Sequence, residues 1–246
     1  NRLLPVDSER NFNRLLTAKK KSNTLVVIGN GPSLNKMNLS WLSQYDTFTC
    51  NSFFLKAREL DIKPTYHIVE DHLPAFENRK QLEDFNPGIF FCPKNLNWMF
   101  PDAKSPKFVF RFDRNALRYR CLGTFKFSGK PWRIVHWGGT VLFAALQIAL
   151  AMKYERVILI GVDLSYIVPE DALVEGNIVT TLGADPNHFD GSYFGYGKKW
   201  HLPDCGRMQK SFDIAYREYK KHGIELLNAG LDSKLATIPK INFREL

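Results

Sequence analysis

The chain has 246 residues, 44% of them hydrophobic, and a formal net charge of +9 at pH 7. This length fits one large α/β domain or two small ones, and the hydrophobic content is sufficient for a substantial core. The longest apolar run, from Thr140 to Met152, is far shorter than the ~20 residues that cross a bilayer, which excludes it as a membrane-spanning helix. The basic charge favours polyanionic partners such as nucleotide phosphates, acidic glycans, anionic lipid headgroups or nucleic acid, and a merely soluble basic surface explains it equally well.

The cysteines and the start of the chain bear on its location. Cys50, Cys92, Cys121 and Cys205 include no C-x-x-C pair, so they predict neither a zinc site nor a disulfide framework. Reduced, buried thiols are typical of a cytoplasmic protein. No signal-peptide pattern is present, and because the first residue is Asn1 rather than Met, we expect an excised part of a longer protein.

The N-terminal segment differs in composition from the rest. Residues 1–22 are polar and basic, with apolar residues at partly helical spacing, and they predict a helix that ends in Lys19-Lys20-Lys21-Ser22. The lysines are either a solvated helix end or a point of peripheral contact with the anionic surface of the inner membrane. Residues 23–246 are predicted to form a single Rossmann-like domain.

Apolar runs alternate with helical patterns along this domain, which is typical of an α/β fold with a doubly wound, mainly parallel sheet and helices on both faces. Strands are predicted at 25–28, 47–50, 65–69, 88–92, 108–110, 157–160 and 224–227. Helices are predicted at 38–44, 75–84, 140–152 and 207–222. Residues 93–132 are irregular, aromatic and basic, and a long insertion, interpreted as a lid, covers about 165–205.

The first strand runs into a glycine-rich turn and a Pro-Ser pair that predicts a helix start. Glycines let a backbone approach a ligand closely, and N–H groups at a helix start attract anions, so this turn predicts a nucleotide site. Leu34 stands where a dinucleotide fingerprint needs its third glycine, and no Walker motif is present. An ordinary turn without a ligand is the alternative. The assigned residues are Gly29, Asn30, Gly31, Pro32 and Ser33.

Small polar residues follow several of the predicted strands, at the edge where doubly wound sheets bind their ligands. An asparagine side chain offers both a donor and an acceptor, which suits a base or a ribose. Each residue alone could cap its own backbone, but together they favour a site. They are Asn30, Asn51, Glu70-Asp71-His72, Gly138-Gly139-Thr140, Asp163 and Asn228.

Two histidines of the insertion, His188 and His201, are candidate general bases because an imidazole titrates near neutral pH. Glu70 and Asp71 are an alternative focus, since adjacent acids could hold Mg²⁺ through bridging phosphates. They have no acidic partner at a fixed spacing, so no metal site is predicted. Side chains of the insertion that could bind a leaving phosphate are Tyr166, Tyr193, Tyr196, Lys198 and Lys199.

Four of these motifs carry a family resemblance. They are Val27-Ile28-Gly29-Asn30-Gly31-Pro32-Ser33-Leu34, Cys50-Asn51-Ser52-Phe53-Phe54, Gly139-Thr140-Val141 and Ile158-Leu159-Ile160-Gly161-Val162-Asp163. The chain resembles the bacterial sialyltransferases of glycosyltransferase family 42, and it is also similar to the MAF-type proteins that glycosylate flagellin and to MptE-like pterin pyrophosphokinases. The resemblance covers most of 25–163 and, more loosely, 185–240.

The resemblance to family 42 implies a cytosine nucleotide as the carrier of the sugar. A nonulosonic, sialic-acid-like sugar would pass from a CMP-activated donor to a glycan or protein hydroxyl, with inversion and without a metal or other cofactor. Asn30 and Asn51 match the family's nucleotide-binding asparagines, and Gly139-Thr140 matches its phosphate-side turn. Asp71 stands where the family has a further donor-binding Asn.

The resemblance leaves the base open between two residues. His201 is the better match to the family's catalytic histidine, and His188 falls near an earlier family histidine. Tyr166 is displaced by one residue from a phosphate-binding tyrosine of the family. The hypothesis is that one imidazole deprotonates the acceptor hydroxyl while Tyr193, Tyr196 and Lys199 stabilise the departing phosphate.

Two other functions remain open from the sequence. One is an MptE-like pyrophosphokinase that uses ATP and Mg²⁺, and the other is a non-catalytic module that binds acidic glycans or nucleotides through residues 93–132. For the transferase, the expected partners are a nucleotide-sugar donor and a glycan or glycoprotein acceptor, not nucleic acid. A homo-oligomer is a further open possibility.

Overall fold

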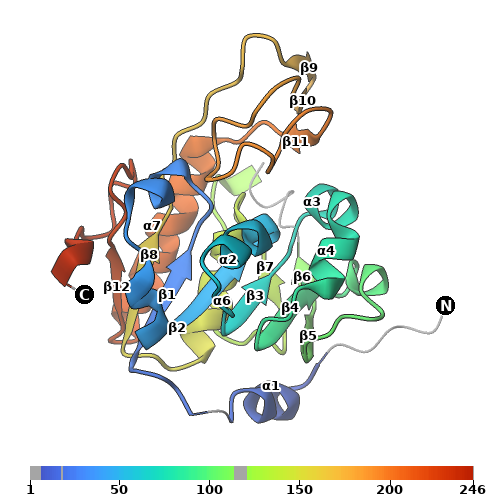
Figure 1. Ribbon diagram of the computed structural model, residues 1–246. Helices are drawn as coiled ribbons and strands as arrows, with labels where there is room; N and C mark the ends of the chain where they lie inside the picture. Colours follow the sequence, from blue (N-terminus) through green and yellow to red (C-terminus); the bar gives the residue numbers. More distant parts are fainter. Residues whose placement is uncertain (1–6, 18, 114–120, 246) are drawn as a thin grey trace.

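The computed structural model describes residues 7–17, 19–113 and 121–245. Its centre is a seven-stranded sheet in which every neighbouring pair is parallel, with strand order β12-β8-β1-β2-β3-β4-β5 (Figure 1). The predicted α/β class is thereby confirmed. The strands are β1 (Thr24–Ile28), β2 (Asp46–Cys50), β3 (Tyr66–Ile68), β4 (Ile89–Pro93), β5 (Lys107–Phe110), β8 (Arg156–Ile160) and β12 (Glu225–Asn228).

Helices cover both faces of the sheet, because successive side chains of each strand point to opposite faces. In β1, Leu25 and Val27 belong to one buried cluster, whereas Val26 and Ile28 belong to another. The first face carries α1 (Glu9–Leu15), α6 (Val141–Ala151) and α7 (Cys205–Lys221). The second carries η1 (Pro32–Lys36), η2 (Ser40–Gln44), α2 (Phe54–Glu59), α3 (His72–Glu77) and α4 (Arg79–Asp84).

The N-terminal helix is shorter than predicted. It ends at Leu15, before the lysine run, where the hydroxyl of Thr17 donates to the carbonyl of Arg14 (2.9 Å). Its Phe12 is buried against Phe108 of β5, with ring centroids 5.1 Å apart. The helix therefore packs into the core of the sheet. Among the described residues, no helix is long and apolar enough to cross a bilayer.

Two further helices differ from the prediction. The segment 38–44 forms only the 3₁₀ helix η2. The segment 75–84 divides into α3 and α4 at Asn78, whose side chain donates to the carbonyl of Pro74 (3.0 Å) and so competes with the regular helical bonds.

The insertion between β8 and α7 forms a small antiparallel sheet of its own, with strand order β11-β10-β9, beyond the carboxyl ends of the central strands (Figure 1). Its buried Val179 and Trp200 share a cluster with Ile158 and Ile160 of β8, so the insertion packs on the central sheet. Its strands are β9 (Leu173–Glu175), β10 (Ile178–Thr180) and β11 (Lys199–His201).

In the region 93–132, residues 93–113 and 121–132 are described and contain little regular structure. Residues 114–120 of this region lie outside the described residues. A two-stranded parallel sheet joins it to the segment before α6. The remaining short elements of the fold are β6 (Phe112–Asp113), β7 (Val135–His136), η3 (Asn51–Phe53), η4 (Asn97–Met99) and η5 (Phe243–Glu245).

The strand order reverses beside β1, because β2 lies on one side of it and β8 on the other. The carboxyl ends of β1 and β8 approach closely. The N–H of Gly29 donates to the carbonyl of Ile160 (2.8 Å), and that of Gly31 donates to the carbonyl of Gly161 (2.9 Å). A Cβ atom on Gly29 would lie 2.2 Å from the Gly161 oxygen. This reversal is where doubly wound sheets open a ligand crevice.

We expect Gly29→Ala to lower the free energy of unfolding by about 1–3 kcal/mol, because the added methyl group must push β1 away from β8. Gly183→Ala is the matched control, since a Cβ atom there would make an ordinary contact of 3.7 Å with Asp171. Urea unfolding measures both variants. Equal stability of the two would contradict the close approach of the strands.

A second prediction concerns His67, which is fully buried in β3 with its Nδ1 2.8 Å from the hydroxyl of Thr49. Burial lowers the pKa of His67 from 6.5 to about 3, because the charged imidazolium loses its hydration. Below about pH 6.5 the unfolded chain binds a proton that the folded chain rejects. The free energy of unfolding should therefore decrease as the pH is lowered from about 6.5 to about 3, by up to about 1.4 kcal/mol per pH unit.

The His67→Gln variant, which does not titrate, should lose this part of the pH dependence. Urea unfolding at several pH values between about 4 and 6.5 gives the slope for both proteins. Equal slopes would mean that His67 is charged in the folded protein.

Candidate functional site

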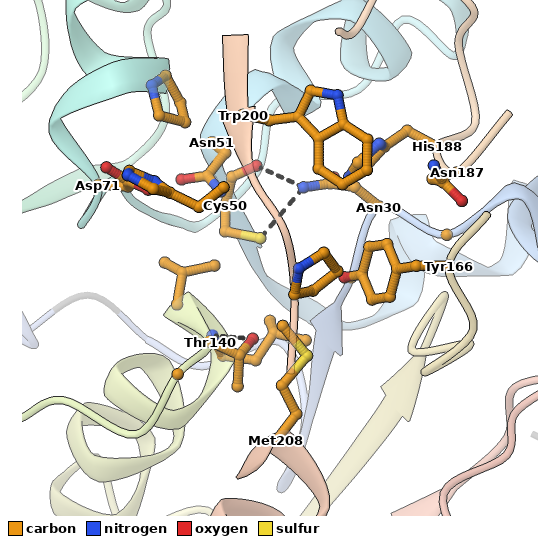
Figure 2. A pocket seen from close by; sticks show the side chains of 18 of the residues that line it. Asn30, Cys50, Asn51, Asp71, Thr140, Tyr166, Asn187, His188, Trp200 and Met208 are labelled. Carbon is orange, nitrogen blue, oxygen red and sulfur yellow. Dashed lines mark hydrogen bonds and ion pairs between the residues drawn. The ribbon is translucent and has the colours of Figure 1, made fainter. Parts of the chain in front are cut away.

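A cavity of about 510 Å³ opens at the carboxyl ends of β1, β2, β3 and β8, between the start of α6 and the insertion. Its size is that of pockets that hold small organic ligands. Figure 2 shows side chains from the central sheet, from α7 and from the insertion around it. The predicted site residues that line it are Gly29, Asn30, Gly31, Asn51, Asp71, Gly139, Thr140, Asp163, Tyr166, His188, Tyr193 and His201.

The side-chain amide of Asn30 has a fixed orientation at the end of β1. Its Nδ2 donates to the backbone carbonyl (3.1 Å) and the sulfur (3.3 Å) of Cys50 (Figure 2). It also donates to the hydroxyl of Tyr193 (2.9 Å). Because a carbonyl oxygen can only accept, the amide nitrogen must face Cys50. The Oδ1 atom of Asn30 is buried and has no hydrogen-bond partner among the described residues. Such an atom costs about 1–3 kcal/mol, which a ligand donor would relieve.

Asn51 occupies the corresponding position at the end of the neighbouring strand β2. Its φ is +49°, in the left-handed region that asparagine tolerates better than most residues. Its Oδ1 is likewise buried and, within the described part of the chain, lacks a hydrogen-bond partner. The structure therefore brings two amide acceptors to one wall of the cavity.

The helix start after Gly31 does not form the expected anion site. It is the five-residue 3₁₀ helix η1, and the carboxylate of Asp163 accepts both the N–H (2.9 Å) and the hydroxyl (2.5 Å) of Ser33. A Cβ atom on Gly31 would lie 2.4 Å from the Asp163 carboxyl carbon. Of the predicted nucleotide-binding residues, Pro32 and Ser33 do not line the cavity, and a carboxylate already caps this turn.

Tyr193 belongs to the insertion and contacts the wall of the cavity that Asn30 and Asn51 form, the asparagine wall. Its hydroxyl accepts from Asn30, and its ring stacks on His188 with centroids 3.9 Å apart and planes 4° apart. Burial raises the pKa of Tyr193 well above its ordinary value, so the phenol stays protonated. Burial also raises the pKa of Tyr166, whose half-buried ring lies 6.4 Å from that of His188.

Each candidate histidine has a carboxylate at its Nδ1 atom. For His188 the partner is Asp185 at 2.7 Å, and for His201 it is Asp71 at 3.3 Å. His188 is mostly buried, with 12% of its side chain exposed, whereas His201 is 37% exposed. Asp71 is also 3.3 Å from Nδ1 of His72. Both imidazoles line the cavity, so both stay candidates for the base.

The opposite wall of the cavity combines a helix start with a cation. Gly139, at φ +84°, precedes Thr140, whose hydroxyl caps α6 by accepting from Leu142 (3.4 Å). The side chain of Arg207 packs against Gly139, lies 5.1 Å from the centre of the Trp137 ring and pairs with Asp204 (3.2 Å). A guanidinium beside a helix N-terminus is suited to an anionic group.

Two predicted phosphate ligands lie elsewhere. Tyr196 is 79% exposed and borders a separate hollow of about 450 Å³ with Arg58. Lys199 is exposed on β11 and does not line the cavity. In this part of the insertion, Tyr193 and Phe194 take the inward positions, so Tyr196 faces outward. Lys198 is also occupied, because its ammonium donates to two backbone carbonyls.

The site also includes residues that were not predicted from the sequence. Asp185 precedes His188 by three positions, and an acid at that distance from a histidine is a signal that could have been used. Arg207 lies within a predicted helix, where an arginine is ordinarily a surface residue, so no local pattern distinguished it. The other newly identified lining residues include Cys50, Trp137, Asn177, Asn187 and Trp200.

The chain is similar to known proteins in sequence and in fold. A family model described as 6-hydroxymethylpterin diphosphokinase MptE-like matches residues 3–168. No curated protein sequence matches the chain. The solved structure of the MAf glycosyltransferase from Magnetospirillum magneticum AMB-1 is similar at a TM-score of 0.58 and 14% sequence identity, covering 99% of this chain and 40% of that one.

At this identity the structural likeness shows a shared fold, and this chain spans less than half the length of the glycosyltransferase chain. The matches confirm the predicted resemblance to MptE-like and MAF-type proteins, whereas the resemblance to family 42 stays a prediction. Because the family model covers more than half of the sequence, the chain belongs to the MptE-like family.

Proposed function

We propose that this chain transfers a nonulosonic, sialic-acid-like sugar from a CMP-activated donor to a hydroxyl of a glycan or protein, with inversion. The observation that carries the proposal is the composition of one cavity. The cavity is lined by Asn30 and Asn51, whose buried amide oxygens lack partners among the described residues. It is also lined by two imidazoles, each paired with a carboxylate. The fold shared with a glycosyltransferase also supports a sugar-transfer function.

The amide oxygens of Asn30 and Asn51 would hold the nucleoside. Each is an acceptor that lacks a donor in the described structure, and the cytosine amino group and the ribose hydroxyls are donors. A ligand that supplies these donors gains more than the usual hydrogen-bond energy, because it removes the penalty of the unpaired oxygens.

The phosphate of the donor would lie at the opposite wall. Thr140 and the following residues present the start of α6, and the guanidinium of Arg207 is beside them. Tyr166 stays protonated because burial raises its pKa, so its hydroxyl can donate to a phosphate oxygen. In this proposal these groups stabilise the negative charge of the departing CMP.

Transfer would then need one base. An imidazole nitrogen takes the proton of the acceptor hydroxyl, and the hydroxyl oxygen forms a bond to the anomeric carbon of the sugar. The bond from that carbon to the phosphate oxygen breaks, and its electron pair leaves with CMP. Attack on the face opposite CMP inverts the anomeric centre.

A diphosphokinase is the second candidate, and the family match favours it. It would use Mg²⁺ and ATP, with Glu70 and Asp71 as the predicted acids. Asp71 fits a cation poorly, because one carboxylate oxygen accepts from Leu73 (3.2 Å) and the other is 3.3 Å from Nδ1 of His201. A magnesium ion would have to compete with these neighbours for the carboxylate.

A panel of nucleotides separates the two functions. We expect CMP to raise the melting temperature without Mg²⁺, since a ligand that binds only the folded state must stabilise it. ATP should have no effect with or without Mg²⁺. Thermal shift measurements with CMP, CDP, UDP, GDP and ATP test this, and stabilisation that requires both ATP and Mg²⁺ would support the diphosphokinase instead.

Two variants test the asparagine wall by calorimetric titration with CMP. Asn51→Ala should weaken CMP binding by roughly 10-fold, the effect of one lost hydrogen bond. Tyr193→Phe removes an acceptor from Asn30 but retains the ring, so we expect a smaller loss. Asn95→Ala, the same change at an exposed site outside the cavity, is the control. Equal affinity in all three variants would contradict the assignment of the nucleoside to this wall.

A further inference from the structure

We propose that Asp185 is a positioning residue that holds His188 in the tautomer with an unprotonated Nε2 atom, and that this makes His188, rather than His201, the base. The inference deepens the proposed function and rests on it for the catalytic step. The placement of the imidazole proton is a property of the folded protein alone and can be tested separately.

The carboxylate of Asp185 is buried and surrounded by donors. One oxygen lies 2.7 Å from Nδ1 of His188 and accepts the N–H of Phe194 (3.0 Å), and the other accepts the N–H of Asn187 (2.8 Å). A carboxylate that accepts two backbone N–H groups is an acceptor toward the imidazole as well. The Nδ1 atom must therefore carry the proton, and in the neutral ring Nε2 keeps its lone pair.

The turn that carries His188 is held by hydrogen bonds to the asparagine wall. The N–H of Phe189 donates to the carbonyl of Asn30 (3.0 Å), and the Phe189 carbonyl accepts from the side chain of Asn35 (2.8 Å). Asn187 makes two bonds of 2.7 Å to the backbone of Ile167. The imidazole is thus held at a fixed place relative to Asn30, as catalysis by a positioned base requires.

Rings on several sides fix the plane of the imidazole. Tyr193 stacks on one face at 3.9 Å, and Phe194 meets it edge to face at 5.2 Å. The same Tyr193 bonds to Asn30, so one side chain sets both the base and the nucleoside acceptor. Figure 2 shows His188 and Asn30 on the same side of the cavity.

His201 lacks this support. Its contact with Asp71 is longer, at 3.3 Å, and the same carboxylate is 3.3 Å from His72. Asp71 is itself 41% exposed, whereas Asp185 is 3% exposed. Water competes for an exposed carboxylate, so it selects one tautomer of its partner less strongly. The geometry favours a binding role for His201 at the cavity and the proton-accepting role for His188.

Long-range ¹H–¹⁵N correlation of the imidazole nitrogens tests the tautomer directly. In the ¹⁵N-labelled protein at alkaline pH, we expect His188 to be protonated at Nδ1 and not at Nε2. His188→Gln and His201→Gln assign the signals. Asp185→Ala should shift His188 toward the Nε2–H form that a free imidazole prefers, and Asp71→Asn should leave the His188 signals in place.

If Asp185→Ala fails to fold, the unmodified protein and Asp185→Asn decide the question. Asp185→Asn has nearly the same volume but no charge, so we expect a mixture of tautomers. Protonation of Nε2 in the unmodified protein would overturn the proposal, as would an unchanged tautomer in every folded variant of Asp185.

Release of CMP from CMP-N-acetylneuraminate in a single turnover, with water as the hydroxyl that accepts the sugar and gives its proton to the base, tests the catalytic part. His188→Gln should slow it by roughly 10²- to 10⁴-fold, the usual effect of losing a general base. Asp185→Ala should slow it by roughly 10- to 100-fold, and His201→Gln by less than either. The reverse order of the two histidine variants would overturn the assignment.

The failure of the proposed function has a different signature. The unmodified protein would then neither bind CMP nor release it from the donor, while the tautomer of His188 would still respond to Asp185. Normal CMP release in both Asp185 variants together with the expected tautomer shift would instead show that Asp185 orients a ring that is not the base.

Discussion

The close approach of β1 and β8 at their carboxyl ends is the constraint on which the rest of the cavity depends. Gly29 lies so close to the Gly161 carbonyl that no side chain fits between the strands, and the two strand ends continue to bond to each other through Gly31. This contact places Asn30 beside Cys50 and Asp163 over η1. The polar ends of separate strands thereby become one wall of a ligand-sized cavity rather than unrelated turns.

From this wall a chain of side-chain contacts leads to the proposed chemistry. Asn30 bonds to Tyr193, Tyr193 stacks on His188, and His188 bonds to Asp185. Each of these side chains is buried or nearly so. In such surroundings an unpaired polar atom costs more free energy, and a paired polar atom keeps a fixed orientation. The insertion is therefore part of the site's framework: it packs on the same cluster as β8 and supplies both imidazoles.

The sequence predicted most of the fold because buried parallel strands are short apolar runs, and it located the strand-end residues Asn30 and Asn51 because ligands bind at that edge. It did not anticipate that a carboxylate 130 positions away accepts the N–H of Ser33 at the expected anion site. It also failed at Tyr196, since no local pattern tells which tyrosines of an irregular insertion face inward. Long-range partners such as Asp185 and Arg207 are set by tertiary packing, which periodicity does not encode.

A crystal structure of the complex with CMP shows whether Asn30 and Asn51 hold the nucleoside. We expect donors of the nucleoside to lie within hydrogen-bond distance of Oδ1 of Asn30 and of Asn51. The phosphate should lie beside Thr140, and Nε2 of His188 should face the space next to the phosphate. A CMP molecule bound outside this cavity, or bound within it with both amide oxygens still unpaired, would contradict the proposed nucleoside site.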